Sequence, residues 1–399
     1  MEEKKIIYLD NAATTRMREE VLNEMIPYFS ENYGNASSIY SVGREAKAVL
    51  DEKRAVIANI LGAKDNEIFF TGGGSEADNW AIKGIAFSNR GKGNHIITTK
   101  IEHHAVLHTC QYLEKQGFEV TYLPVDENGF IKLEDLENAI RPTTILISVM
   151  FANNEIGTIM PIKEIGKIAK QHKIYFHTDA VQAVGHIPID LSDLDVDLMS
   201  FSGHKFCGPK GVGCLYIKRG VKIDPLIHGG AQERGKRAST ENIAGIVGMA
   251  KALELAAKDM KEETDRILEL REKLINGIFE KIPYVKLNGD REKRLPSNVN
   301  FSIRYIEGES LLLMLDMMGI CASSGSACTS GSLDPSHVLL AIGLPHEIAH
   351  GSLRLSIGRE TTNEDVDKVL EVLPGIVERL RSMSPLYDEV LKKEDGNNV

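Results

Sequence analysis

Two widely separated groups of residues in this 399-residue chain have side chains that could act together. Lys205 follows a short apolar run, with Ser202 and His204 just before it. A lysine held at a strand end beside a hydroxyl and an imidazole suits a pyridoxal phosphate Schiff base, because the amine must be positioned and the phosphate needs donors. Cys328 lies in a loop of small residues, 323–331, which predicts an open thiol. Together they indicate that a cofactor activates an amino acid while a separate thiol attacks it.

The elements that must position these groups form an alternating pattern. Short apolar runs alternate with segments of helical length between about residues 67 and 218, which predicts a mainly parallel sheet sandwiched by helices, an α/β fold. The runs are Glu67–Thr71, His95–Thr99, Val120–Leu123, Thr144–Met150, Ile174–Thr178, Leu198–Phe201 and Gly213–Ile217. Ligands bind at the carboxyl ends of such strands. Polar groups follow five of the runs: Thr71–Glu76, Glu102–His104, Asn153–Glu155, Asp179 and Ser202–Lys205.

The segment Thr71–Glu76 predicts one side of a phosphate site. Its three consecutive glycines, which include Gly74 and precede Ser75, leave backbone N–H groups free to approach an anion at the positive end of a helix. A tight turn without a ligand explains the segment equally well by itself. Ser202 and His204 could donate to the same anion, and this convergence favours the phosphate.

Two further side chains suit a flat, protonated ring. Asp179 ends an otherwise apolar strand, where an unpaired carboxylate would be costly, and a pyridine nitrogen would be its natural partner. The alternative is a helix N-cap. Gln182 and Asn154 could reach the ring oxygen, although a solvated helix position and a turn are the ordinary roles of such residues.

The roles of two histidines and one arginine each have more than one explanation in the sequence. His103 or His104 could stack on a cofactor and carry protons, but histidines in the first turn of a helix are usually polar surface. Arg354 lies among apolar neighbours in Gly351–Ser356 and needs an anionic partner. A substrate carboxylate and a salt bridge between domains are nearly equal explanations.

The chain length favours two domains, because a single core stops growing near this size. A run without Gly or Pro, Met249–Asn276, predicts a long helix that bridges them. After it come Asn298–Ile303, Glu309–Met318, Gly351–Ser356 and a helix from Asn363, which predict a smaller α+β domain. We expect residues 15–258 to form the large domain, and residues 1–14 and 259–399 the small domain with the Cys328 loop.

Composition excludes several classes of function. The net charge of −10 leaves no basic face for bulk nucleic-acid binding. No apolar run has the length of an export signal or a membrane span, so we expect a cytoplasmic protein without membrane contact. The 5 cysteines are odd in number and show no Cys-x-x-Cys spacing, so neither disulfides nor a structural metal site is expected.

An ordered set of motifs closely resembles the cysteine desulfurases of the NifS and IscS group, and the resemblance runs almost from end to end. The motifs are Asp10–Thr15, Tyr33–Asn35, Glu102–His103, Asn153–Thr158, His177–Gln182, Ser202–Lys205, His228–Gly230 and Ser324–Cys328. Two motifs depart mildly from the family pattern: Gly73–Glu76, where Gly-Ala-Thr-Glu is common, and Ala238–Thr240, where Ser-Gly-Thr is frequent. Both keep a hydroxyl at the corresponding place.

The resemblance implies a pyridoxal phosphate enzyme of fold type I that works as a homodimer. Lys205 would carry the cofactor, and Cys328 would form a persulfide from L-cysteine, with an iron–sulfur scaffold or another protein as sulfur acceptor. By carry-over, His103 would stack on the ring, Asp179 would pair with its nitrogen, and Asn154 and Gln182 would contact its oxygen. Gly74, Ser75, Ser202 and His204 would hold the phosphate with Thr240 of the other subunit, and Asn35 and Arg354 the substrate carboxylate.

The resemblance leaves rival functions to be distinguished. A selenocysteine lyase, an aminotransferase or a kynureninase-like hydrolase could share the fold, and a non-catalytic scaffold could have kept it. An aminotransferase needs no cysteine in the 323–331 loop, and retention of Lys205, Asp179, His103 and Cys328 argues against a scaffold. We expect no resident metal, although Cys328 could ligate a cluster transiently on a partner.

Overall fold

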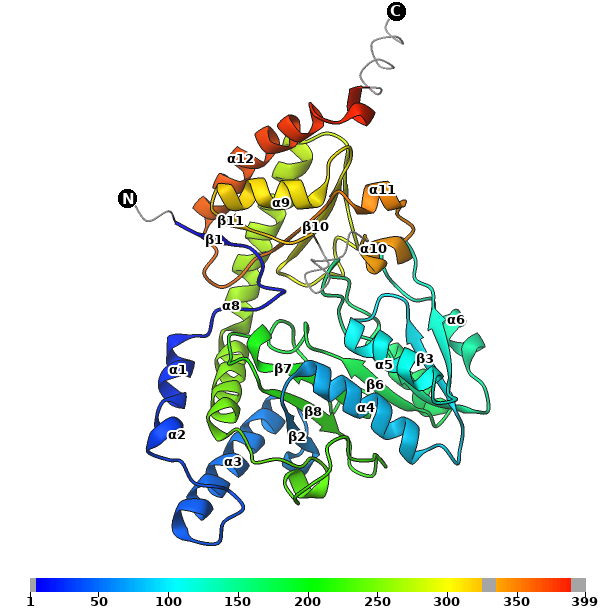
Figure 1. Cartoon of the computed structure of the whole chain (residues 1–399), viewed down its shortest axis with the longest axis vertical. Coiled ribbons are helices and arrows are strands. Elements are labelled where there is room, and N and C mark those ends of the chain that lie inside the picture. The colour runs from blue at the N-terminus through cyan, green and yellow to red at the C-terminus, as the bar shows by residue number, and fades with distance from the viewer. Residues whose placement is uncertain (1–4, 325–334, 389–399) are drawn as a thin grey trace, which may run out of the picture.

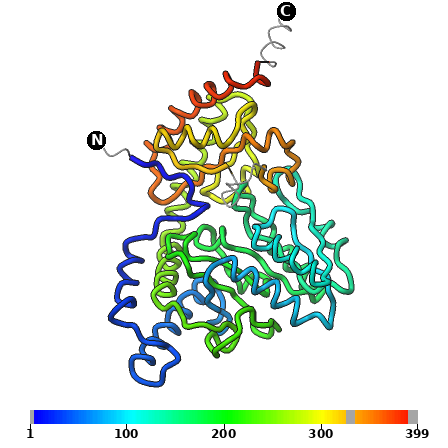
Figure 2. Tube along the Cα trace, in the orientation of Figure 1, coloured from blue at the N-terminus to red at the C-terminus, as the bar shows by residue number. Residues whose placement is uncertain are grey.

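The computed structural model describes residues 5–324 and 335–388, so Cys328 lies outside the described residues. Figure 1 shows a larger part built around a central sheet and a smaller part above it. The long helix α8 (Ile243–Lys281) runs through both parts, as the trace in Figure 2 also shows. The chain ends that are described lie in or beside the smaller part.

The central sheet has seven strands in the order β2-β8-β7-β6-β5-β3-β4. The strands are β2 (Ile68–Thr71), β3 (His95–Thr99), β4 (Glu119–Leu123), β5 (Thr144–Ser148), β6 (Tyr175–Asp179), β7 (Leu198–Ser202) and β8 (Gly213–Ile217). Strand β8 is antiparallel to both of its neighbours, and the pairings among the other strands are parallel. The predicted mainly parallel sheet is therefore confirmed.

Helices cover both faces of this sheet. On one face, α4 (Gly74–Ser88) and α5 (His104–Glu114) pack on Phe69 and Leu146 through a core that includes Trp80. On the other face lie α3 (Ser41–Ile60), α6 (Leu133–Ala139), α7 (Ile162–Gln171) and the first part of α8. In α7 the buried residues Ile162, Ile165, Ile168 and Ala169 recur on one side, which is the spacing that a helix needs to bury a single face.

The smaller part has its own core around a three-stranded antiparallel sheet. Strand β10 (Asn298–Ile303) lies between β12 (Ser352–Ser356) and β9 (Val285–Leu287). Helices α9 (Gly308–Met317) and α12 (Asn363–Arg381) cover it together with the end of α8. A short parallel pair, β1 (Ile7–Tyr8) with β11 (Ile320–Cys321), brings the start of the chain here. The short helices α10 (His337–Ala341) and α11 (His346–Ala349) contribute their buried residues to the core of the larger part.

Helix α8 is longer than the predicted Met249–Asn276, because glycines that we took as a boundary lie inside it. A Cβ at Gly248 would lie 2.3 Å from the Met25 sulfur. Helix α1 (Glu19–Met25) therefore packs against α8 at a position that requires glycine. A short helix, α2 (Pro27–Ser30), follows α1. Among the described residues, no helix is long and apolar enough to cross a membrane.

Candidate active site

A cavity of about 360 Å³ lies at the carboxyl ends of the central strands. Most of the predicted site residues line it together: Gly74, Ser75, His103, Asn154, Asp179, Gln182, Ser202, His204, Lys205 and Arg354. They come from segments of the chain that extend from residue 74 to residue 354. The fold therefore brings the separate motifs to one place.

Lys205 is held at the end of β7 by a 3₁₀ turn, Gly203–Lys205. Its Nζ donates to the backbone oxygens of Ala12 (2.6 Å) and Ala13 (2.8 Å). Behind the turn, His186 Nε2 donates to the Lys205 carbonyl oxygen at 2.8 Å. The side chain and the backbone of Lys205 are thus both fixed by the protein.

One end of the cavity is suited to an anion. Helix α4 begins at Gly74, so its first N–H groups and the Ser75 hydroxyl lie at the positive end of the helix. A Cβ at Gly74 would lie 2.7 Å from the Val181 side chain, so the close approach of this helix start requires glycine. Ser202 and His204 line the same cavity. Burial, together with the Lys205 charge, lowers the pKa of His204 to about 4, so it is a neutral donor or acceptor at pH 7.

Asp179 lies at the end of β6 and is 5% exposed. Its Oδ1 accepts a hydrogen bond from the Val181 N–H at 2.9 Å, a contact that resembles the helix cap we considered. Burial raises the pKa of Asp179, while this hydrogen bond and the charge of Lys205 act in the opposite direction. A cationic ligand atom would reduce the cost of its negative charge. Gln182, one turn further on, donates to the Ala12 carbonyl oxygen at 2.9 Å.

His103 and His104 both line the cavity, at the start of α5. His103 Nδ1 accepts from the Ala105 N–H at 3.1 Å, so its Nε2 carries the proton in the neutral ring. Burial and the nearby Lys205 charge lower the pKa of His103 to about 4. The His104 ring lies between His108 and His337, with centroid distances of 5.0 and 4.7 Å. The structure thus orients His103 by a backbone contact, whereas His104 stacks on other histidines.

Arg354 has an anionic partner within the chain. Its Nη2 lies 2.8 Å from Asp10 Oδ1, and the arginine side chain is only 2% exposed. Its Nη1 donates to the Asn154 carbonyl oxygen at 3.1 Å. The salt bridge that was one explanation of Arg354 is therefore present. Because Arg354 also lines the cavity, a bound carboxylate could contact the same guanidinium group as Asp10.

Two predicted residues of the described chain do not line this cavity. Asn35 is exposed, and its side-chain oxygen accepts from the Ser37 N–H. Thr240 is also exposed. Cys328 lies outside the described residues, but residues on both sides of that segment meet the site. Ser323 pairs with Arg354 through the backbone, and His337 lines the cavity.

Sequence reasoning missed several lining residues. Ala12 and Ala13 act through backbone oxygens, which no side-chain pattern reveals. Asp78, one turn into α4, had no distinguishing neighbour in the sequence. Glu155 was noted only as part of a motif, and its buried carboxylate accepts a hydrogen bond from Ser336, the N-cap of α10.

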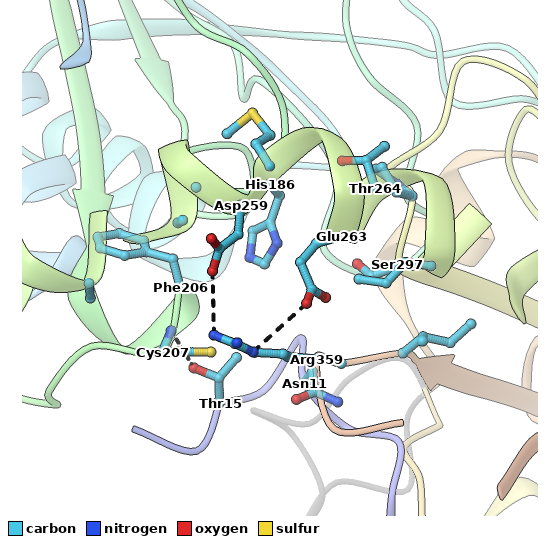
Figure 3. A pocket seen from close by; sticks show the side chains of 18 of the residues that line it. Asn11, Thr15, His186, Phe206, Cys207, Asp259, Glu263, Thr264, Ser297 and Arg359 are labelled. Atoms are coloured by element: carbon cyan, nitrogen blue, oxygen red, sulfur yellow. Dashed lines mark hydrogen bonds and ion pairs between the residues drawn. The ribbon is translucent and has the colours of Figure 1, made fainter. Parts of the chain in front are cut away.

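A second, smaller cavity of about 100 Å³ lies on the other side of the turn that carries Lys205. Figure 3 shows Cys207 and Phe206 at one wall and Arg359 pointing toward Asp259 and Glu263. Arg359 is 3.6 Å from Asp259 and 3.8 Å from Glu263, and Arg18 is 2.9 Å from Asp259. The acidic side chains here are paired with arginines of the same chain. Among the described residues, no cluster of side chains is arranged to hold a metal ion.

The larger cavity fits pyridoxal phosphate in its donor set. It offers one lysine amine, one buried carboxylate and, at a helix start, N–H and hydroxyl donors for a phosphate. With the α/β fold, these groups define the class of fold type I pyridoxal phosphate enzymes.

The comparisons with known proteins agree with this class. Residues 7–369 match the family model "Aminotransferase class-V". The chain is 64% identical over 393 residues to "Cysteine desulfurase IscS" of Clostridium botulinum, covering 98% of this chain and 99% of that protein. A solved "NIFS-LIKE PROTEIN" is similar with a TM-score of 0.89 and 42% identity, over 94% of this chain and 100% of the other. "SspA in complex with cysteine" has a TM-score of 0.78 and 39% identity, over 88% and 98%.

The chain belongs to the aminotransferase class-V family, within its group of cysteine desulfurases related to IscS and NifS-like proteins. Pyridoxal phosphate is the cofactor of this family and of this protein.

Proposed function

We propose that this protein converts L-cysteine to L-alanine and keeps the sulfur as a persulfide on Cys328. The observation that carries the proposal is the convergence of Lys205, Asp179 and Arg354 on one cavity, next to the residues that flank the Cys328 segment. A relative solved in complex with cysteine supports the substrate. Arg354 and Asn35 would together hold the substrate carboxylate. The carboxylate would either replace Asp10 as the partner of Arg354 or share the guanidinium group with it.

The chain's own residues would divide the work as follows. Gly74, Ser75, Ser202 and His204 would hold the phosphate, His103 would stack on the ring, Asn154 and Gln182 would contact its oxygen, and Asp179 would pair with its nitrogen. The bound cofactor supplies an electron sink for the carbon next to the substrate amine. Lys205 carries the cofactor and then moves the proton at that carbon. His103, oriented by Ala105, exchanges a proton at the substrate sulfur through Nε2.

The sulfur step requires a second thiol. The Cys328 thiolate attacks the substrate sulfur, a sulfur–sulfur bond forms, and the carbon–sulfur bond of the substrate breaks. The electron pair of the broken bond returns to the carbon, which takes up a proton and leaves as part of L-alanine. The persulfide sulfur then passes to an acceptor, for which we propose an iron–sulfur scaffold or another sulfur-carrier protein, in the cytoplasm.

We also propose a homodimer. Large apolar side chains lie exposed around α2 and the start of α3: Phe29 is 66%, Tyr33 75% and Ile39 89% exposed. A second copy that covers this face would bury them. It would also bring Thr240, which does not line the cavity of its own chain, to the phosphate site of the other subunit. Within each copy, residues 15–258 would form the large domain, and residues 1–14 and 259–399 the small one.

One experiment tests the central proposal. The purified protein is incubated with L-cysteine, alanine and sulfide are measured, and the persulfide is located by mass spectrometry. We expect alanine and transferable sulfur in equal amounts, with the persulfide on Cys328. Cys328→Ser should retain bound cofactor but form no persulfide, whereas the control Cys321→Ser, at a half-buried position outside the cavity, should behave like the parent.

The same experiment separates the rival functions. A Cys328→Ser protein that releases alanine at the parent rate under mild reductant would be a simple lyase. Transfer of the amino group to an oxoacid would indicate an aminotransferase. Alanine release from selenocysteine but not from cysteine would indicate a selenocysteine lyase.

A further inference from the structure

Behind Asp179 lies a second buried carboxyl group, Asp78, to which no role has been given above. Asp78 is on α4, one turn after the helix start at Gly74, and it lines the same cavity as Asp179. It is 1% exposed. Its Oδ1 has no hydrogen-bond partner among the described residues. A carboxylate in this position would have lost its hydration with little compensation.

The groups that face Asp78 do not supply a compensating charge. They come from three neighbouring segments: His177 and Asp179 from β6, Ser200 from β7, and Glu102 from the segment after β3. Asp179 and Glu102 are themselves carboxyls, and ionising both Asp78 and Asp179 would place like charges together in a buried site. A hydrogen bond with the neutral Ser200 hydroxyl lowers the pKa of Asp78, but by less than burial and the Asp179 charge raise it.

Within the described part of the chain, His177 is the group that could become a cation beside Asp78, and its contacts favour the neutral ring. Its Nε2 is 3.6 Å from Asp78 Oδ1 but only 2.9 Å from Ser200 Oγ. Its Nδ1 is 2.9 Å from Ser148 Oγ. Both ring nitrogens are thus engaged by hydroxyl groups, and burial lowers the pKa of His177 to about 3.

We propose that Asp78 is held as the neutral acid, so that Asp179 carries the only negative charge of this carboxyl pair toward the cofactor ring. The hydroxyl of Asp78 donates to Ser200, Ser200 donates to His177 Nε2, and the proton on His177 Nδ1 points to Ser148. This arrangement needs no second ion. Asp78 Oδ1 still has no hydrogen-bond partner among the described residues, which costs less for a neutral carbonyl oxygen than for a charged carboxylate. Burial, together with the nearby Asp179 charge, raises the pKa of Asp78 well above 3.8.

The role of Asp78 is to position a proton, not to contact the reacting atoms. With Asp78 neutral, the charge that faces the ring nitrogen resides on one carboxylate at a defined place. This inference rests on the proposed function only in its placement of the cofactor ring against Asp179. The protonation state of Asp78 itself can be tested without cofactor or substrate.

The first test is the pH dependence of stability in Asp78→Asn. In the unfolded chain Asp78 loses its proton near the ordinary value of 3.8, whereas the folded protein keeps it up to the raised pKa. Between these two values the folded state binds one more proton, so rising pH favours unfolding of the parent. Asparagine has a similar shape and cannot ionise. Relative to the variant, the unfolding constant of the parent full chain should therefore rise about tenfold per pH unit in this window.

Urea unfolding of the full chain at several pH values between 5 and 8 measures this difference. We expect Asp78→Asn to be the more stable protein, with a gain that grows with pH. Glu102→Gln removes the neighbouring buried carboxyl, whose pKa burial raises to about 8 although Thr99 and Met150 donate to it, so the contribution of Glu102 to the pH dependence is measured separately. A variant Asp78→Asn that is less stable than the parent at pH 8 would indicate an ionised Asp78 paired with a protonated His177, and would overturn the proposal.

Infrared spectroscopy of the parent protein tests the same point without relying on a variant that must fold. At pH 7 we expect a carbonyl band of a protonated carboxylic acid that Asp78→Asn removes and Glu102→Gln leaves in place. Glu102→Gln should instead remove the acid band of Glu102, whose pKa burial raises to about 8. Nitrogen NMR should show His177 as a neutral ring with its proton on Nδ1. An imidazolium signal from His177, or no such acid band in the parent, would contradict the assignment.

Cofactor binding separates this inference from the proposed function. Asp78→Asn should change the dissociation constant of pyridoxal phosphate by no more than about threefold, since a neutral group replaces a neutral group, whereas Asp179→Asn should weaken it more than about tenfold. If neither the parent nor the variants bind pyridoxal phosphate, the proposed function fails while the stability and infrared results still decide the state of Asp78. Equal weakening by both substitutions would overturn the present inference alone.

Discussion

The two cavities on either side of the turn that carries Lys205 differ in how their charges are compensated. In the larger one, the buried carboxyls Asp78, Glu155 and Asp179 have pKa values raised by burial. In the smaller one, Asp259 and Glu263 face arginines of the same chain (Figure 3). A site that must receive a charged ligand keeps groups whose charge the ligand will compensate, whereas a structural junction compensates its charges internally. The two cavities therefore differ more in how their buried charges are compensated than in their shape.

The largest effect should come from Lys205→Ala in the larger cavity. Among the residues that the structure describes, no other lysine lines that cavity, and Lys205 is proposed both to bind the cofactor and to transfer a proton. We expect turnover of L-cysteine to fall by at least about 10⁴-fold, with loss of the absorbance of the lysine-bound cofactor. Alanine release and the absorption spectrum measure this. The next lysine along the chain is Lys210. A borohydride-reducible cofactor linkage at Lys210 with full turnover would assign the role to that residue.

Asp179→Ala should have the next largest effect. The protein should fold and still bind some cofactor, because the phosphate contacts are intact. The ring nitrogen would have lost its fixed negative partner, so we expect turnover to fall by about 10² to 10³-fold. Steady-state rates at saturating cofactor measure the effect on chemistry, and the cofactor spectrum reports the state of the ring. Unchanged rates and spectra would remove Asp179 from its proposed role.

The sequence predicted the strands and the polar residues at their ends well, because neighbouring residues along the chain carry the signal for both. A buried parallel strand is a short apolar run, and a polar residue at its end, such as Asp179, can be located by counting. Lys205 was found in the same way. Helix α8 extended beyond its prediction because a glycine that breaks an isolated helix can be required where two helices meet, as Gly248 is beside Met25.

What the sequence did not reveal depends on distant contacts. Asp10 is 344 residues from Arg354, so nothing local indicated that they form an ion pair. The oxygens of Ala12 and Ala13 are backbone atoms, and Asp78 looks like any polar residue of a helix until the fold buries it. These contacts decide the electrostatics of the larger cavity.

Arg354→Lys changes a residue that lines the larger cavity and should have an effect of intermediate size on turnover. Lysine keeps the positive charge but cannot hold a carboxylate through two parallel N–H donors. We expect KM for L-cysteine to rise roughly 10-fold with a smaller change in kcat, which corresponds to about 1.4 kcal/mol of lost binding. Measuring both constants distinguishes a substrate contact from a purely structural ion pair. If Arg354 served only to pair with Asp10, stability would fall while KM stayed the same.

Arg359→Gln probes the smaller cavity and should have the smallest effect. The arginine is 40% exposed, and its contacts to Asp259 and Glu263 are long, at 3.6 and 3.8 Å. Because solvent screens such pairs, we expect a loss of no more than about 1 kcal/mol in the free energy of unfolding. Asp259 keeps its 2.9 Å contact to Arg18, so the local charge stays compensated. The values of kcat and KM for L-cysteine should match those of the parent. A drop in kcat comparable to that of Asp179→Ala would show that the smaller cavity acts on Lys205 through the intervening turn, and the contrast between the two cavities would no longer hold.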